Sequence, residues 1–234
     1  MILETLDIQT FYGESQALQG VTLQLDHGET VCILGRNGAG KSTTLKSIIG
    51  LTPPRSGKVI FEGREIQGMP PHKIARAGIG YVPEDRRIFP GLTVRENLDV
   101  AAHNRKGQAA RWTVDGILKK YEMLGERAEQ DGATLSGGQQ QMLAVARSLM
   151  TQPKLLLLDE PNEGLAPVIV QQIGALIDDL SQTTTILFTD QSVQFALRHA
   201  KRAYILEKGQ VVHSADSNDL KHDQATQDRF LSVA

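Results

Sequence analysis

The 234-residue sequence carries 25 lysines and arginines against 27 aspartates and glutamates, a formal charge of −2 at pH 7, and 40% of its residues are hydrophobic. This balance permits a sizeable core and lacks the basic surface that binding to a nucleic-acid backbone requires, so we expect no nucleic-acid partner. The single cysteine, Cys32, excludes an internal disulfide framework. The sequence has neither a basic start nor a run of about 18 apolar residues, so we expect neither export nor a membrane-spanning helix.

The start of the chain has the pattern of strands followed by a helix. Residues 1–27 alternate apolar and polar positions, which predicts short strands, half exposed at the edge of a sheet. The apolar run from Glu29 to Leu34 predicts a buried strand, and a glycine-rich loop follows it. Residues Ser42 to Ile49 then show helical periodicity, which Gly50 closes. This segment is therefore expected to fold as strand, loop and helix.

The middle of the chain changes to a helical pattern. Between about Asn97 and Asp131, apolar residues recur at the spacing of an amphipathic helix, namely Val114, Ile117, Leu118, Tyr121 and Leu124. We interpret this region as an inserted helical subdomain.

The α/β pattern resumes after this insertion. Leu155–Leu158, Thr185–Phe188 and Ala203–Leu206 are short apolar runs separated by helical stretches, as expected of buried parallel strands. Residues 214–234 are polar with a weak apolar finish, and we expect no further domain there.

The glycine-rich loop matches the phosphate-binding pattern G-x-x-x-x-G-K-S. Its glycines let backbone N–H groups point at phosphate oxygens, and the helix that follows presents its positive end to the same anion. Lys41 is expected to reach the β and γ phosphates, and Ser42 to offer its hydroxyl to Mg²⁺. A plain glycine-rich turn is the alternative, which the full match in this setting disfavours. The predicted ATP-binding residues here are Gly35, Arg36, Asn37, Gly38, Ala39, Gly40, Lys41, Ser42 and Thr43.

Two carboxylates follow the predicted strand at Leu155–Leu158. Asp159 and Glu160 should lie at the carboxyl edge of the sheet, where α/β proteins bind ligands. We expect Asp159 to hold Mg²⁺ through water, and Glu160 to orient and deprotonate the attacking water. Paired acids after a strand can also be simply solvated, but the phosphate loop upstream favours the functional interpretation.

A serine, two glycines and a glutamine, Ser136 to Gln139, stand before a predicted helix from Gln140 to Met150. This arrangement creates a second helix start suited to phosphate, although by local chemistry a capped turn is an open alternative. The order of phosphate loop, L-S-G-G-Q and a strand ending in Asp-Glu resembles the ATP-binding-cassette (ABC) family over nearly the whole chain.

The resemblance implies an α/β P-loop NTPase fold of the ABC ATPase type, with an antiparallel β subdomain and an inserted helical subdomain at about 97–150, all within one nucleotide-binding domain, 1–234. It also implies head-to-tail dimers in which each ATP lies between one subunit's phosphate loop and the other's signature. Ser136, Gly137, Gly138 and Gln139 would therefore serve the partner's ATP, and Tyr12 would stack on adenine. Core packing is the alternative for Tyr12, whose neighbour Phe11 could take the same place.

The sequence departs from the family pattern at several positions. Glu84 stands where a glutamine usually contacts the metal and couples to the membrane subunit, and Gln191 stands where a histidine usually touches the γ phosphate. An amide cannot become an imidazolium, so we assign the catalytic base to Glu160 and only phosphate sensing to Gln191. Asn162 and Ala166 also differ, in the loop that links the two ATP sites in the family.

The segments from Pro83 to Pro90 and from Asp159 to Pro167 resemble ATPases of branched-chain amino-acid importers. This implies an ATPase on the cytoplasmic face of a bacterial inner membrane, paired with an identical or a second ABC ATPase, bound to permease subunits and supplied by a solute-binding protein. Arg86 to Phe89 should lie near the groove for the permease, unless they form a solvated loop. Alternatives are a urea or short-amide importer, a lipopolysaccharide-type exporter, a soluble ABC ATPase and a nucleotide-binding module without turnover. The substrate is not encoded in this chain.

Overall fold

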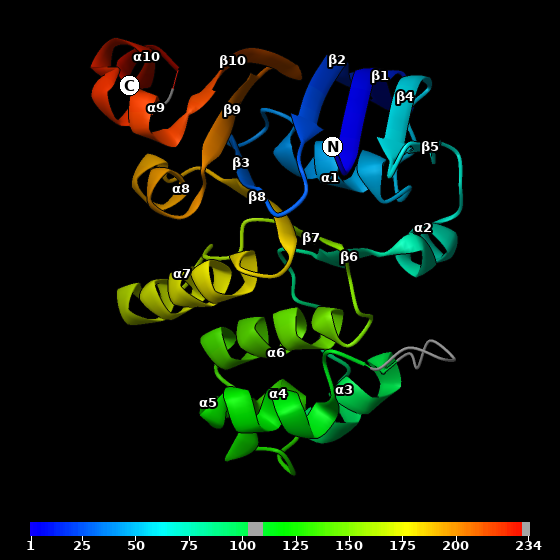
Figure 1. Cartoon of the computed structure of the whole chain (residues 1–234), viewed down its shortest axis with the longest axis vertical. Coiled ribbons are helices and arrows are strands. Elements are labelled where there is room, and N and C mark those ends of the chain that lie inside the picture. Colours follow the sequence, from blue (N-terminus) through cyan, green and yellow to red (C-terminus); the bar gives the residue numbers. More distant parts are fainter. Residues whose placement is uncertain (103–109, 231–234) are drawn as a thin grey trace.

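In the computed structural model, which describes residues 1–102 and 110–230, the N-terminal strands form a separate antiparallel sheet (Figure 1). Its strand order is β2-β1-β4-β5, with bounds β1 Leu3–Tyr12, β2 Ser15–Leu25, β4 Ser56–Phe61 and β5 Arg64–Glu65. The expectation of short strands was wrong, because β1 and β2 have 10 and 11 residues. The pairing register of β1 with β2 shifts near Asp7, where the apolar and polar residues stop alternating. The two strands therefore stay paired beyond the point where a strict alternation would end.

The second sheet has six strands in the order β10-β9-β3-β8-β7-β6, parallel except for the β9–β10 pair. The bounds are β3 Thr30–Leu34, β6 Ile79–Val82, β7 Leu155–Leu158, β8 Thr185–Asp190, β9 Arg202–Glu207 and β10 Gln210–Asp216. Every residue of β3, β7 and β8 is buried, as the apolar runs predict for strands covered on both faces. Their carboxyl ends meet at one edge, where the phosphate loop begins.

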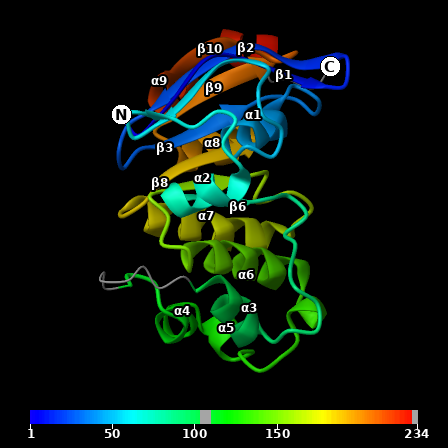
Figure 2. The same cartoon turned by 90° about the vertical axis from the view of Figure 1, so that its right-hand side faces the viewer.

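Helices cover both faces of this sheet. On one side α1 Lys41–Ile48 lies between the two sheets, and α2 Pro71–Ala77 lies beside β6 (Figures 1 and 2). On the other side are α6 Gly137–Leu149 and α7 Pro167–Ser181, followed by α8 Val193–His199. The apolar side chains form two core clusters, one between the sheets and one between the six-stranded sheet and these helices. The chain beyond β10 continues as α9 Ser217–His222 and α10 Gln224–Phe230.

A helical region lies at the end of the molecule away from the antiparallel sheet (Figure 2). It contains α3 Val94–Ala101, α4 Val114–Lys120, α5 Glu122–Gly125 and the 3₁₀ turn η1 Gly132–Thr134, all packed near α6. It begins at Val94, earlier than expected, because Thr93 and Glu96 form a capping box. The expected single amphipathic helix was also wrong, since the backbone leaves helical geometry at Tyr121 (φ −110°, ψ 81°). The middle of the predicted region, 103–109, lies outside the described residues.

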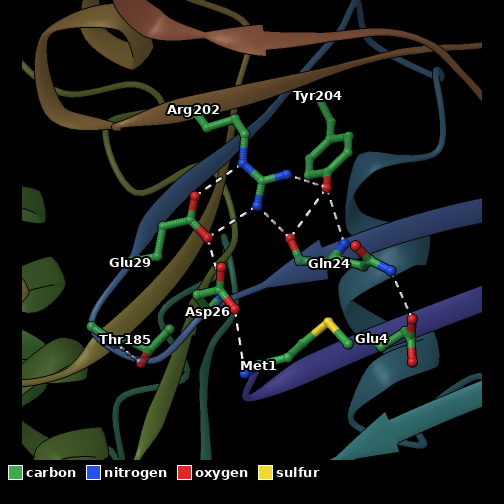
Figure 3. Close-up of polar contacts among 9 residues, drawn as sticks. Met1, Glu4, Gln24, Asp26, Glu29, Thr185, Arg202 and Tyr204 are labelled. Atoms are coloured by element: carbon green, nitrogen blue, oxygen red, sulfur yellow. Dashed lines mark hydrogen bonds and ion pairs between the residues drawn. The ribbon is translucent and has the colours of Figure 1, made fainter.

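A partly buried ion pair ties the two sheets together (Figure 3). The Arg202 guanidinium in β9 donates to both carboxylate oxygens of Glu29, at 2.9 and 3.0 Å, and to the Gln24 carbonyl at the end of β2, at 2.7 Å. The Tyr204 hydroxyl accepts a hydrogen bond from the Gln24 N–H at 3.0 Å. This network fixes the position of β3, the strand before the phosphate loop, relative to the antiparallel sheet.

Candidate nucleotide site

The phosphate loop joins β3 to α1, and its glycines fit positions that other residues would strain. Gly40 has φ 109°, and a Cβ there would lie 2.9 Å from Leu18 Cδ2. A Cβ at Gly35 would lie 2.5 Å from the Leu206 carbonyl oxygen. Close approach to β2 and β9 therefore requires glycine at both positions.

Lys41 folds back over this loop. Its buried ammonium donates to the Gly35 carbonyl at 2.8 Å and the Arg36 carbonyl at 3.2 Å, and it forms an ion pair with the Glu160 carboxylate at 3.0 Å. The two residues predicted to handle phosphate and water thus lie in direct contact. Glu160 adopts φ 43°, a left-handed conformation that is uncommon outside glycine and that concentrates at functional sites.

The Asp159 carboxylate is buried, with 2% of its surface exposed, and a hydroxyl binds each oxygen. Tyr81 Oη in β6 donates to Oδ2 at 3.1 Å, and Thr189 Oγ1 in β8 donates to Oδ1 at 2.9 Å. The same Thr189 oxygen accepts the Glu160 backbone N–H at 2.9 Å. Sequence reasoning did not single out Tyr81 or Thr189, although each stands near the carboxyl end of a strand that neighbours β7.

Gln191 and Glu84 complete the group of predicted site residues at this edge. The Gln191 amide donates to the Glu163 carboxylate at 2.8 Å and to the Glu160 carboxylate at 3.4 Å. Partial burial, and then the negative charges of Glu160 and Asp159, raise the pKa of Glu84 above its ordinary value. The Glu84 carboxylate is therefore repelled by those of Glu160 and Asp159, and a cation bound among the three would relieve this repulsion.

The donors present fit Mg²⁺ bound together with a nucleotide. Among the described residues, no group of three or more His, Cys, Asp or Glu side chains could hold a metal ion by itself. Mg²⁺ needs no such cage, since it usually takes one or two protein oxygens, several waters and substrate phosphates. The Asp159 carboxylate, already oriented by two hydroxyls, and the nearby Glu84 and Ser42 supply oxygens of this kind.

An open cavity of about 440 Å³ extends from the loop along β2. It is lined by Gly38, Gly40, Lys41, Ser42, Thr43 and Glu160, together with Ser15, Gln16, Ala17, Gln19 and Lys208. Tyr12 stands at the end of β1 with 49% of its surface exposed, so core packing is not its role, and adenine stacking stays a prediction. The Phe11 ring is covered by the Arg55 guanidinium at 4.4 Å.

The predicted signature residues form the start of α6. Ser136 caps the helix, and the Gln139 side-chain oxygen accepts a hydrogen bond from the Ser136 N–H at 2.9 Å, so the two complete a capping box. Gly138 lies against α7, where a Cβ would meet Ile169 Cγ2 at 2.4 Å, and Gly137 lies against the Arg86 side chain. Of the described residues that line the phosphate cavity, none comes from 136–139.

A second, more apolar cavity of about 450 Å³ lies beside the edge strand β6, between α2 and the helices α3 and α6. We call it the β6 groove. Its wall includes Leu51, Tyr81, Arg86, Phe89 and Val100. Arg86 and Phe89 border this groove, and its use by a permease stays a prediction. The Arg147 guanidinium lies over the Phe89 ring at 4.6 Å and holds the loop by donating to the Arg86 carbonyl.

A family profile described as ABC transporter matches residues 18–163. This chain belongs to the ABC transporter family. The cassette is 42% identical, over 96% of its length and 97% of the relative's, to the high-affinity branched-chain amino acid transport ATP-binding protein BraG of Pseudomonas aeruginosa. It is 37% identical, over 94% of both chains, to a probable branched-chain amino acid transport ATP-binding protein LivF of Archaeoglobus fulgidus.

Further similarities agree with the family and its fold. The cassette is 33% identical, over 98% of its length and 97% of the relative's, to the lipopolysaccharide export system ATP-binding protein LptB of Haemophilus influenzae. Among solved structures, the cassette MJ1267 in its ADP conformation matches with a TM-score of 0.82 and 27% identity, covering 98% of this chain and 96% of that one. The cassette MJ0796, solved as a dimer, matches with a TM-score of 0.81 and 27% identity, covering 92% and 99%.

These findings establish an ABC-type ATPase cassette with the predicted α/β fold of an antiparallel and a mainly parallel sheet. In the described residues, no helix is long and apolar enough to cross a lipid bilayer.

Proposed function

We propose that this cassette is the ATP-hydrolysing subunit of an importer for branched-chain or other amino acids. The observation that carries the proposal is the match to BraG along nearly the whole of both chains. The segment from Pro83 to Pro90, which includes Glu84 and resembles this branch, supports it.

The contacts at the site support a specific division of labour for ATP hydrolysis. Lys41 binds the β and γ phosphates, which compete with the Glu160 carboxylate for its ammonium. Nucleotide entry therefore frees Glu160 to accept a proton from water as the water oxygen bonds to the γ phosphorus and the bond from that phosphorus to the ADP oxygen breaks. Gln191, which already contacts Glu160 and Glu163, senses the γ phosphate by donating its amide hydrogen bond.

Asp159, Ser42 and Glu84 are the residues that would hold Mg²⁺. When bound, the ion neutralises charge that develops on the phosphate oxygens. The protein's share is to orient the carboxylate, and the hydrogen bonds to both Asp159 oxygens support this role.

A second copy of this chain, or a related ABC ATPase, completes the site. Ser136 to Gln139 form a helix start outside the cassette's own phosphate cavity, which supports their use on a partner's nucleotide. The single nucleotide-binding domain 1–234, with its helical subdomain at about 97–150, is the unit that we propose to dimerise.

The β6 groove is the proposed docking site for a permease subunit at the cytoplasmic face of the inner membrane. Leu51, Phe89 and Val100 are exposed apolar side chains around it, which is the character of a partner-binding surface. A solute-binding protein on the other side of the membrane would then select the substrate.

The test is to purify the cassette with the permease and solute-binding proteins encoded beside it, and to measure ATP hydrolysis with single solutes. Leucine, isoleucine or valine should stimulate turnover. Urea and short amides are the second arm, and stimulation by them alone would reassign the importer. Lipopolysaccharide is the third arm, because the similarity to LptB favours an exporter as the second candidate. Absence of stimulation by any amino acid or amide contradicts the importer proposal.

A further inference from the structure

Tyr81 occupies two functional surfaces at once. The residue lines the β6 groove, and its hydroxyl donates to Asp159 Oδ2 at 3.1 Å. It belongs to the edge strand β6, which pairs with β7 so that Tyr81 lies opposite Leu157, two residues before Asp159. A half-buried phenol thus spans the distance from the groove to the phosphate site.

The Tyr81 hydroxyl is the donor in its contact with Asp159, because an ionised carboxylate can only accept hydrogen bonds. Its partner Asp159 is itself buried, so the carboxylate depends on protein donors for solvation. Hydrogen bonds to ionised groups are stronger than those between neutral groups, and they fix the acceptor's orientation.

The two hydroxyls on Asp159 differ in what else they contact. Thr189 is fully buried in β8, and its oxygen is shared between Asp159 Oδ1 and the Glu160 N–H. Tyr81 alone of the two lines the groove. A movement of the Tyr81 side chain would therefore change the hydrogen bond to one oxygen of Asp159, while the Thr189 bond to the Glu160 N–H would stay in place.

We propose that Tyr81 is a positioning residue that fixes the Asp159 carboxylate through its hydroxyl and links that carboxylate to occupancy of the β6 groove. The inference rests on the proposed roles of Asp159 and of the groove. The inference adds Tyr81 as a direct connection between the β6 groove and Asp159, separate from Glu84.

The first test compares Tyr81→Phe, which keeps the ring, with Tyr121→Phe, which removes the hydroxyl of another half-buried tyrosine near an aspartate, Asp179. The readout is ATP affinity by titration calorimetry, with excess EDTA and then with Mg²⁺. Tyr81→Phe should leave the affinity in EDTA unchanged and reduce the gain from Mg²⁺ by about tenfold, the usual effect of losing a group that orients a metal ligand. Tyr121→Phe should match wild type in both conditions.

A second test addresses the groove. Val100→Cys places a thiol on its exposed wall, and the native Cys32 is fully buried, so N-phenylmaleimide should fill the groove selectively. Labelling should change the gain in ATP affinity from Mg²⁺ at least about twofold, as expected when a ligand's orienting group is disturbed. The double variant Val100→Cys/Tyr81→Phe should show no change on labelling. Equal changes in both backgrounds, or no change in either, would overturn the link to the groove.

Asp159→Asn separates failure of the inference from failure of the proposed function. If Asp159→Asn keeps the full gain from Mg²⁺, the proposed metal role of Asp159 is wrong. If Asp159→Asn loses that gain while Tyr81→Phe keeps it, the metal role stands and the positioning role of Tyr81 is refuted.

Discussion

Glu160 combines a left-handed backbone with contacts to Lys41 and Gln191, so its carboxylate is held in one place. Replacing it by glutamine keeps the shape and removes the proton acceptor. Glu160→Gln should retain ATP binding and lower the turnover number by about 100-fold or more, the usual share of a general base. Steady-state phosphate release measures this.

Glu163→Gln is the matched control, because Glu163 also accepts a hydrogen bond from Gln191 but does not contact Lys41. It should reduce turnover only a few-fold. Wild-type turnover in Glu160→Gln would mean that another group takes the proton.

Asp190 is a buried carboxyl next to Gln191, and burial raises its pKa from 3.8 to about 6 even though the Ser192 N–H donates to it at 2.6 Å. Because the folded protein holds this proton more tightly than the unfolded chain, the group favours folding at low pH, and this contribution is lost as pH rises from about 4 through 6.

Asp190→Asn should therefore raise stability relative to wild type by about 3 kcal/mol at pH 7.5 but by only about 1 kcal/mol at pH 4.5. Urea unfolding at the two pH values measures the difference. An equal effect at both would show that Asp190 has an ordinary pKa.

At the scale of elements, the Arg202–Glu29 pair decides how β9 and the strand before the phosphate loop meet. Arg202→Met leaves a buried carboxylate with one partner fewer, so we expect a loss of about 2 kcal/mol, less than for a fully buried pair because the Arg202 side chain is 25% exposed. Thermal unfolding with calorimetry measures it.

The double variant Arg202→Met/Glu29→Met removes both charges and should recover much of the loss, since an unpaired buried charge is the main penalty. A double variant less stable than Arg202→Met would contradict this explanation. The surface pair Lys58–Glu65, with both side chains about half exposed, offers a control whose removal should have little effect.

Elements with strong local signals could be predicted from the sequence. The strands β3, β7, β8 and β9 are apolar runs because both faces of a covered parallel sheet exclude water, and the loop before α1 has a motif with a mechanism. The break at Tyr121 could not be predicted, because the residues on both sides of it bury the same face, Ile117, Leu118 and Leu124.

The strand pattern also led us to expect Asp159 and Glu160 at the carboxyl edge of the sheet, and the phosphate-loop motif and the family resemblance pointed to Lys41 and Gln191, respectively. The structure brings the side chains of Lys41, Glu160 and Gln191 into contact there, and their roles stay predictions. The contacts of Tyr81 and Thr189 to Asp159 could not be predicted from the sequence, since they depend on the strand order β8-β7-β6, which no local pattern encodes.

At the scale of the whole molecule, the phosphate cavity and the Ser136 helix start belong to different parts of the fold. A nucleotide bound between two copies would contact the phosphate cavity of one copy and the Ser136 helix start of the other. Its hydrolysis would let the two copies separate. The proposed coupling to a permease would run through this cycle, because α6, which begins at the signature residues, also borders the β6 groove.

The most direct test of this account is the mass of the Glu160→Gln protein by light scattering, with and without ATP. We predict a monomer without nucleotide, a dimer with ATP and magnesium, and a return to monomer when Ser136→Glu is added, because a carboxylate at the helix start repels the partner's phosphate. A protein that binds ATP and stays monomeric, or a dimer that Ser136→Glu leaves intact, would contradict the shared site.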